Sequence, residues 1–433
     1  MKKLITISLL FFSVGAINAY WDGGASSWTE GEGTETNPYL IQKEEHLAYL
    51  QQTVNEGEGY EGQYFLLTTN LDMDGKTFNP IGFYDDYSLD NVWVEDSKPF
   101  LGTFDGGYNT IDNVTIELAE EDPYEIGGIG LFAVGRQSTC IKNLKLGSNV
   151  TVNAKGSPDI GGILGYGEGS TIENCSFAGT INGGPTETGG IIGRGEKGLT
   201  ISGCINSGNV IGNSFTGGIA GSIDNSTIIN CLHDGTVNGN FGYWVSGIVS
   251  WALNSSVKSS VSIGSIIGEK GSIYMPGISP ICSELEKSTA TNCFYVEELT
   301  GCKPLMSQSG VIAVSAEEIK SEEILVKLNG ENEESPWILS EETGYPTLDW
   351  TLNMGGAGVN AVLAEKDNSI KISNGTVNIT AIEGQYTILD LSGKTVEKGC
   401  VNGTIELNPV YKGIFVIVVR SADGSSSTAK ICF

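Results

Sequence analysis

Acidic residues are the first candidates for chemistry in this 433-residue chain. A polysaccharide hydrolase needs two carboxyl groups ~5 to 9.5 Å apart, and a lyase needs a base beside cations that stabilise the sugar enolate. Glu168 and Glu196 follow equivalent apolar runs and could stack, but the next equivalent place holds Asp224, and the sequence gathers no cation nearby. The other acids are scattered singly, as at Asp159 and Glu187. We therefore expect isolated solvent-facing charges rather than a catalytic centre.

Histidine and cysteine form no recognisable catalytic or zinc motif. His46 and His233 lie in different segments, and neither stands beside a Ser or Cys motif that would indicate nucleophilic catalysis. The sequence has no Cys-x-x-Cys pair, so zinc is not expected. We predict a protein without a cofactor.

Asn70, Asp72 and Asp74 precede a glycine at the spacing of the first half of a calcium-binding loop. The twelfth position of such a loop requires a bidentate Glu, and here it is Ile81. A plain turn is therefore favoured over a calcium site. Diffuse calcium binding by the acidic segment around these residues stays open, with solubility as the simpler role of its charge.

Cysteine recurs at one position of a repeated phrase. Strands stacked about 4.8 Å apart hold side chains slightly farther apart than the ~3.8 Å between the Cβ atoms of a disulfide. We therefore predict buried free thiols that act as small apolar filler. Disulfides among Cys282, Cys293 and Cys302, or between Cys400 and Cys432, stay open because the chain has nine cysteines. The predicted ladder consists of Leu144, Cys175, Cys204, Cys231, Ser260 and Cys293.

Aromatic residues near the ends of the expected strands could recognise a sugar. If the repeated phrase folds as a solenoid, its loops stack into one long surface on which these residues would lie. Phe241, Tyr243, Trp244 and Trp251 form the candidate ligand-binding groove. The alternative is that Trp244 and Trp251 plug the core where the repeat degenerates. We expect these aromatic residues to be exposed: Tyr166, Phe215, Phe241, Tyr243, Trp244, Trp251 and Tyr274.

A repeated phrase over residues 127–299 must position all of these side chains. Its anchors Gly127, Gly161, Gly189 and Gly217 are 34, 28 and 28 residues apart, which is a period typical of stacked repeats. Each unit holds three short runs rich in Ile, Val and Thr, which favour strands over helices. Three strands per unit predict one triangular coil of a parallel β-helix, paired with the next coil.

The middle run of each unit also predicts a bend. Its second and fifth positions are mostly apolar, as at Ile201 and Cys204, although a regular strand cannot direct both to one side. The fourth position is Asn or Gly in five of six copies, and these residues tolerate a left-handed backbone best. A bend there would point both flanking side chains inward.

Gly-Gly-Ile-(Ile/Leu)-Gly, a Thr-Ile-x-Asn-Cys strand and Gly-Thr-(Val/Ile)-Asn-Gly together resemble the GLUG-type repeat of bacterial cell-surface proteins. The resemblance covers about 40% of the chain. It implies a solenoid on an exported surface protein, and it carries over no catalytic residue. It therefore indicates a non-enzymatic, adhesin-like protein whose partner is a glycan or a matrix protein.

The N-terminal part reads as an export signal followed by a cap. Residues 1–19 combine two lysines, an apolar run too short to span a membrane, and small residues for cleavage, and no later run is long enough to span. Residues 20–126 carry 23 acidic and 3 basic residues, with a helix expected near 43–54. We predict that they form the N-terminal cap and first coils, and they resemble the segment that often precedes GLUG repeats.

The C-terminal part is predicted to be a second cap and a separate domain. Residues 300–350 include an expected helix over 316–328, with Ser315 as N-cap and Glu318 completing a capping box. Residues 351–359 are a glycine-rich linker. Residues 360–433 have hairpin spacing and predict a small β-sandwich. This last segment resembles the C-terminal sorting domain of type IX secretion cargo, which implies the secretion machinery as a partner.

The net charge of −28 and a pI near 4.3 argue against nucleic acid and anionic membranes as partners, because a phosphate-binding face needs clustered Lys and Arg. Only three arginines are present. The predicted fold is all-β, with a capped parallel β-helix solenoid followed by a small antiparallel β-sandwich. The alternative function is a glycan-active β-helix enzyme, which carboxylates or basic residues clustered on one solenoid face would favour.

Overall fold

The computed structural model of the protein describes residues 21–432 except 84–85, 90–91, 96, 119–126, 154–155, 241–243, 269–276, 305–306, 331–335, 351–369, 374–375, 391–394, 408–413 and 422–425. The predicted export signal and linker lie outside the described residues. The chain divides into two compact units, Met1–Glu317 and Glu318–Phe433. The predicted second cap spans this division, so its role stays a prediction.

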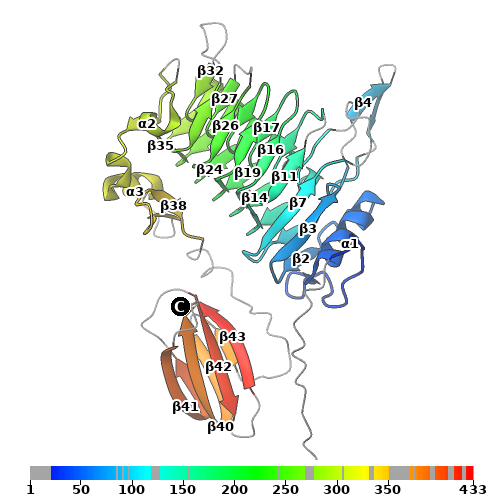
Figure 1. Ribbon diagram of the computed structural model, residues 1–433, viewed down its shortest axis with the longest axis vertical. Helices are drawn as coiled ribbons and strands as arrows, with labels where there is room; N and C mark the ends of the chain where they lie inside the picture. The colour runs from blue at the N-terminus through cyan, green and yellow to red at the C-terminus, as the bar shows by residue number, and fades with distance from the viewer. Residues whose placement is uncertain are drawn as a thin grey trace, which may run out of the picture. The chain divides into compact units, whose positions relative to one another are not determined.

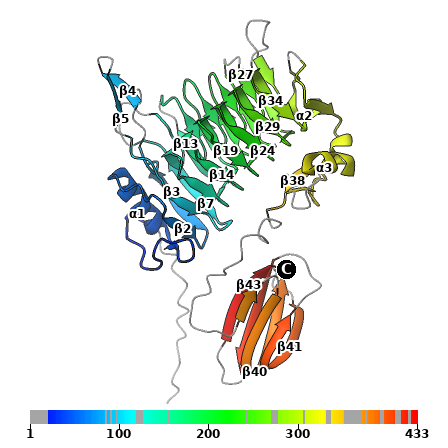
Figure 2. The same cartoon turned by 180° about the vertical axis from the view of Figure 1, so that it is seen from behind.

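The first unit is a stack of parallel strands in which each coil pairs with the next (Figures 1 and 2). One coil contains five short strands rather than the three expected, because the glycine pair forms a ladder of its own and the bend divides the middle run in two. The five strands of one coil are β17 (Thr188–Gly189), β18 (Ile192–Glu196), β19 (Thr200–Ser202), β20 (Ile205–Asn206) and β21 (Asn209–Ile211).

Two sheets contain the strands at and after each glycine pair. The five-stranded sheet is β12 (Ile160–Gly161), β17, β22 (Thr216–Gly217), β27 (Trp244–Ser246) and β32 (Gly277–Ser279). The six-stranded sheet is β8 (Phe132–Gly135), β13 (Leu164–Glu168), β18, β23 (Ala220–Asp224), β28 (Val249–Leu253) and β33 (Cys282–Glu286).

The middle run lies in a nine-stranded sheet. Its strands are β1 (Tyr39–Ile41), β2 (Tyr64–Leu67), β6 (Thr103–Asp105), β9 (Cys140–Lys142), β14 (Thr171–Glu173), β19, β24 (Thr227–Ile229), β29 (Ser256–Lys258) and β34 (Thr289–Thr291).

A fourteen-stranded sheet divides at β7 (Thr110–Ile116), which pairs with β3 (Leu71–Phe78). One branch is β10 (Lys145–Leu146), β15 (Ser176–Phe177), β20, β25 (Leu232–His233), β30 (Val261–Ser262), β35 (Cys293–Val296) and β36 (Val311–Val314). The other is β11 (Val150–Asn153), β16 (Thr180–Asn182), β21, β26 (Thr236–Asn238) and β31 (Ser265–Ile267). The start of β7 pairs with β10 and its end with β11, on either side of Asn113, whose φ is 56°.

The repeated glycines are required by close packing. A Cβ atom on Gly189 would lie 2.1 Å from the carbonyl oxygen of Ile192, and one on Gly190 would lie 2.5 Å from Cγ of Asn206. A Cβ on Gly193 would lie 2.3 Å from the backbone nitrogen of Ile160 in the preceding coil. The Gly-Gly-Ile-x-Gly phrase therefore records where the chain turns and where coils touch.

The predicted bend is confirmed. All six fourth positions have a positive φ, and both flanking side chains of the Gly203 bend, Ile201 and Cys204, are fully buried. The φ angles are 55° at Asn143, 52° at Asn174, 62° at Gly203, 54° at Asn230, 45° at Ser259 and 51° at Asn292.

The helix predicted near 43–54 is also present, as α1 (Glu44–Asn55), with Glu44 and Glu45 in its first turn. It buries Leu47, Leu50 and Val54 and contacts β1 and β3. The carboxylates in the first turn complement the positive end of the helix dipole. The unit also contains the hairpin β4 (Asp86–Leu89) and β5 (Val92–Glu95) and the short α2 (Glu297–Thr300).

In the second unit, the N-cap expected at Ser315 is wrong. A 3₁₀ turn, η1 (Glu318–Lys320), precedes α3 (Glu322–Asn329), and the hydroxyl of Ser321 accepts from the backbone N–H of Ile324 at 3.4 Å. Ser321 is therefore the residue that satisfies the open N–H groups of the first turn. Gly330 follows as C-cap.

The remaining strands are antiparallel, and the all-β fold class is confirmed. β37 (Trp337–Leu339) pairs with β38 (Pro346–Leu348). The C-terminal sandwich consists of β39 (Ile370–Ser373), β40 (Thr376–Asp390), β41 (Thr395–Leu407), β42 (Ile414–Ser421) and β43 (Ser426–Cys432). Here β40 pairs along its length with β41, while β39 and β42 pair with its two halves and β43 pairs with β42.

Candidate functional site

The six-stranded sheet arranges outward side chains in two rows. We call its outward side, with the turns that follow its strands, the six-stranded face. Parallel register places equivalent residues of successive coils about 4.8 Å apart. The first row is Val134, Tyr166, Arg194, Ser222, Trp251 and Glu284. The second row is Glu168, Glu196, Asp224, Leu253 and Glu286.

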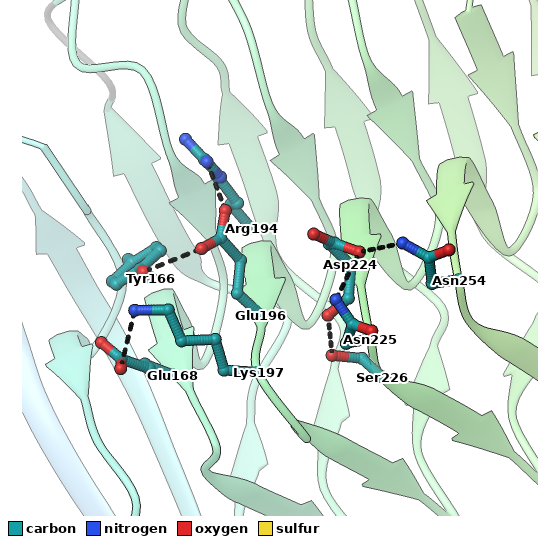
Figure 3. A network of polar contacts seen from close by, with 9 residues as sticks. All are labelled: Tyr166, Glu168, Arg194, Glu196, Lys197, Asp224, Asn225, Ser226 and Asn254. Atoms are coloured by element: carbon teal, nitrogen blue, oxygen red, sulfur yellow. Dashed lines mark hydrogen bonds and ion pairs between the residues drawn. The ribbon is translucent and has the colours of Figure 1, made fainter. Parts of the chain in front are cut away.

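Three cations contact the acids of this face, and Figure 3 shows two of them, Arg194 and Lys197. Glu168 accepts from Nη1 of Arg136 at 3.5 Å and from Nζ of Lys197 at 2.9 Å. Glu196 pairs with Arg194 and accepts from the Tyr166 hydroxyl at 3.3 Å. The expectation that no cation gathers near Glu168 and Glu196 is therefore wrong.

The cations reach these acids because of the turn after each strand. Lys197 directly follows Glu196 with φ of 54°, and its side chain crosses to Glu168 in the preceding coil (Figure 3). Arg136 follows β8 in the coil before that. The register between coils brings residues 29 and 32 positions apart into contact, and this register was not evident from the sequence.

In each of these pairs the cation is the more exposed partner. The exposed side-chain fractions are 28% for Arg136 against 17% for Glu168, and 43% for Arg194 against 18% for Glu196. Lys197 is 61% exposed. The carboxylates therefore lie beneath the cations and hold them at the surface.

Burial and neighbouring charges fix the protonation of this network. Burial acts to lower the pKa of Arg194, but the carboxylates of Asp159 and Glu196 outweigh it and raise that pKa above its ordinary value. Burial raises the pKa of Tyr166, and the charges of Glu196 and Glu168 add to the rise. Arg194 is thus a permanent cation, and Tyr166 is a neutral donor rather than a base.

Farther along, Trp251 of this face forms a half-buried aromatic trio with Trp244 of β27 and with Phe215, which precedes β22. The Phe215 ring centroid lies 5.1 Å from that of Trp244 and 6.1 Å from that of Trp251. The indole N–H of Trp244 donates to Glu284 at 3.0 Å. Neither tryptophan is part of the buried core, so the structure does not place them as core plugs.

The remaining predicted aromatic residues are not brought into this trio. Tyr166 is only 5% exposed, so its predicted exposure is wrong; it packs with Ala133 and Val134 under the guanidinium of Arg194. Burial within the sheet explains this. Phe241, Tyr243 and Tyr274 lie outside the described residues.

A hollow lies at the other end of the charged network. It has a volume of about 520 Å³ and is open to solvent. Arg136 and Glu168 belong both to the hollow and to the network, so a ligand in the hollow would touch the network. The lining residues are Glu61, Leu101, Arg136, Gln137, Ser138 and Glu168.

A polar turn around the Asp224 carboxylate separates the charged network from the trio. The Asp224 carboxylate accepts from the side-chain amides of Asn225 at 2.9 Å and Asn254 at 3.3 Å, and its carbonyl accepts from Ser226 at 2.7 Å (Figure 3). Asn225 has φ of 47°, in the place that Lys197 occupies one coil earlier. The same backbone turn therefore carries an amide here and a cation there.

The calcium candidate forms a hydrogen-bonded bulge of β3. Asn70 accepts from the backbone of Thr110 at 2.9 Å, and Asp72 accepts from the backbone of Asp74 at 3.0 Å and from Asn113 at 2.8 Å. Asp74 accepts from the backbone of Trp21. Within the described residues, no group of three or more His, Cys, Asp or Glu side chains is placed to hold a metal ion.

The comparison with known families matches one coil of the solenoid. Residues 156–182 match the family model described as the GLUG motif. This chain carries a GLUG coil. It contains β13, with Tyr166 and Glu168, and also Cys175, so the matched motif includes part of the six-stranded face.

Two relatives share the repeat region at low identity. Halomucin of Haloquadratum walsbyi is 27% identical over 193 residues, which are 42% of this chain and 2% of that protein. A protein described as a Gly-rich membrane protein, from Evansella cellulosilytica, is 29% identical over 174 residues, 39% of this chain and 18% of that protein. The chain thus spans less than a fifth of either relative. No solved structure matches it. Among the described helices, none has the length and apolarity that a membrane crossing requires.

The thiols of the GLUG coil and its neighbours line the interior. Cys204 donates to the carbonyl of Ser202 at 3.3 Å, and burial raises the pKa of Cys175 and Cys204. These thiols are therefore protonated and weakly reactive. Every ladder position is fully buried: Leu144, Cys175, Cys204, Cys231, Ser260 and Cys293. The cysteines described with side chains are free thiols: Cys140, Cys175, Cys204, Cys231, Cys282, Cys293, Cys302 and Cys400.

Proposed function

We propose that this protein is an exported, non-enzymatic, adhesin-like surface protein whose six-stranded face binds a glycan or matrix-protein ligand. The observation that carries the proposal is the exposed cations of this face together with the aromatic trio that Trp251 forms with Phe215 and Trp244. Aromatic residues and arginine are enriched at binding surfaces. A surface location is supported by the GLUG coil and by the relative described as a membrane protein.

A glycan-active enzyme is the second candidate, and the cations beside Glu168 favour it. A lyase would use such cations to stabilise an enolate, but it also needs a base. Glu168 and Glu196 already bind cations, and Tyr166 is a neutral hydrogen-bond donor. These contacts are better suited to holding a ligand than to removing a proton.

The test is an array of glycans and matrix proteins probed with the purified full-length mature chain and with Trp251→Ala. We expect a ligand whose affinity falls about tenfold in the variant, as for an aromatic residue central to an interface. Ile267→Ala is the matched control, because Ile267 is 52% exposed on another sheet. Equal losses in both variants, or turnover of a polysaccharide, would contradict the proposal.

The C-terminal β-sandwich has a different proposed role. We propose that residues 360–433 direct export or surface attachment, on the basis of their resemblance to a sorting domain and of strands that pair among themselves. Deleting them should abolish surface display while the melting temperature of the solenoid is unchanged, because few contacts cross a domain linker. Unaltered display would refute the sorting role, and loss of the solenoid transition would refute the boundary.

A further inference from the structure

The charge of the chain is distributed so that the six-stranded face is not strongly acidic. Residues 20–126 carry a net charge of −20, whereas the 12 acidic and 9 basic residues of 127–299 give −3. Two of the three arginines in the chain, Arg136 and Arg194, lie on this face with Lys197. In an acidic chain, this is where cations are concentrated near a hollow.

The cations, not the acids, are what a ligand meets first. Each is more exposed than the carboxylate that it contacts. Glu168 and Glu196 therefore act as positioning residues that hold the cations over the sheet. A group that approaches from solvent finds guanidinium and ammonium donors that are already oriented, which suits a carboxylate or sulfate.

The two ends of the face are too far apart for a small ligand. Four ladder steps separate Val134, two residues before Arg136 of the hollow, from Trp251 in the trio. At about 4.8 Å per step this is roughly 19 Å. The polar Asp224 turn lies between them. An extended chain laid along the solenoid axis touches both ends, whereas a single sugar reaches one.

We propose that the ligand of the six-stranded face is an anionic polysaccharide, bound along the solenoid axis. This inference rests on the proposed ligand-binding function of the same face. Its acidic groups meet Arg136, Lys197 and Arg194, and a sugar ring packs on Trp251. The shared chemistry is an anionic group on a sugar ring, either a uronate carboxylate or a sulfate ester. Lys197, the most exposed cation, can turn from Glu168 to the ligand without opening the core.

The experiment measures binding of the purified full-length mature chain to paired probes at low and high salt. Polygalacturonate is compared with its methyl ester, and dextran sulfate with dextran, so that the two members of each pair share a sugar backbone and differ in charge. Polyglutamate supplies the charge without sugar rings. We expect one acidic glycan to bind at least about tenfold more tightly than its neutral counterpart, and high salt to weaken it. The uronate and sulfate probes identify which acidic group is preferred.

Two single variants change the face, Arg136→Gln and Lys197→Gln. The control variant is Lys142→Gln on the nine-stranded sheet. Lys142 pairs with Asp105 at 3.6 Å and is 31% exposed, so it matches Arg136, which is 28% exposed, in charge and exposure. We expect each face substitution to weaken binding about tenfold, as for one lost charge-assisted hydrogen bond, and Lys142→Gln to leave it unchanged.

The outcomes separate this inference from the proposed function. Equal binding of charged and neutral probes that still depends on Trp251 would overturn the anionic ligand and keep the proposed face. If polyglutamate bound as tightly as the acidic glycans, the assignment of the ligand as a polysaccharide would be overturned. Loss of binding in Lys142→Gln equal to that in the face variant would overturn the assigned site. If no glycan probe binds, the inference fails, and the wider array then decides the proposed function.

Discussion

The inside and the outside of the same coils follow different rules. At one interior row of the nine-stranded sheet the residues are Ile141, Ile172, Ile201, Ile228, Val257 and Ala290, all buried. The first outward row of the six-stranded face changes from Val to Tyr, Arg, Ser, Trp and Glu over the same coils. Close-packed layers tolerate small changes in volume only. The outward row combines buried side chains, such as Val134 and Tyr166, with half-buried ones, such as Trp251. The repeated residues therefore determine the fold, and the residues that depart from the repeat form the surface that we propose to bind a ligand.

Another interior row departs from this rule, because it becomes polar part of the way along. Phe177 is followed in register by Asn206, His233 and Ser262, and all four are fully buried. Nδ1 of His233 lies 3.3 Å from the Asn206 amide, and Gly218 leaves the space that the imidazole fills. The interior thus holds one titratable ring against a glycine.

The largest effect is expected from a charge placed on the inner side of the coil. Cys204→Asp would bury an unpaired carboxylate among apolar neighbours and should destabilise the protein by about 3 to 5 kcal/mol. Ser202→Asp is the matched control, because Ser202 lies on the outward side of the same run. That change should alter stability by no more than about 0.5 kcal/mol.

Chemical unfolding with urea measures both values. A similar loss in the two variants would show that the inner and outer sides of this run do not differ as described. A small loss in Cys204→Asp alone would mean that the interior admits water or a partner for the carboxylate, and the ladder would not be a dry core.

The inner and outer sides of the coils could largely be predicted from the sequence, because the same pattern of residues repeats in each coil. The left-handed bend at Asn174 and its equivalents follows from apolar residues three apart, and the β-helix follows from the period. Contacts between coils are less readable. Lys197 reaches Glu168 only because of a left-handed turn and a fixed register, and neither is visible in residue spacing alone.

The predicted number of strands per coil and the predicted start of the helix after Ser315 were both wrong, and the reasons are local. A glycine pair such as Gly189-Gly190 predicts a break between strands, yet Thr188–Gly189 pairs with Thr216–Gly217 as a ladder. Ser315 and Ser321 both precede acidic residues, and only the folded backbone shows that Ser321 caps α3. Local hydrogen bonds of this kind compete closely, so composition does not select between them.

A smaller effect, confined to acidic pH, is expected from His233. Burial lowers the pKa of His233 to about 4 from its ordinary 6.5, so below pH 6.5 the unfolded chain binds a proton that the folded chain refuses. The free energy of unfolding should therefore decrease as the pH is lowered from 6.5 to about 4, and His233 should contribute as much as about 3 kcal/mol to this decrease. Above pH 6.5 the titration of His233 should have no effect on stability.

The matched variant for this titration is His233→Asn, which uses the residue that the preceding coil carries at the same position, Asn206. Urea unfolding from pH 4 to 8 should give a flatter curve for the variant than for the wild type, with the difference disappearing above pH 6.5 apart from a constant offset. Acidic side chains contribute equally to both curves, so their difference isolates the histidine. Parallel curves would mean that His233 is protonated as readily inside the coil as outside it, and the inner row would then resemble the outer face.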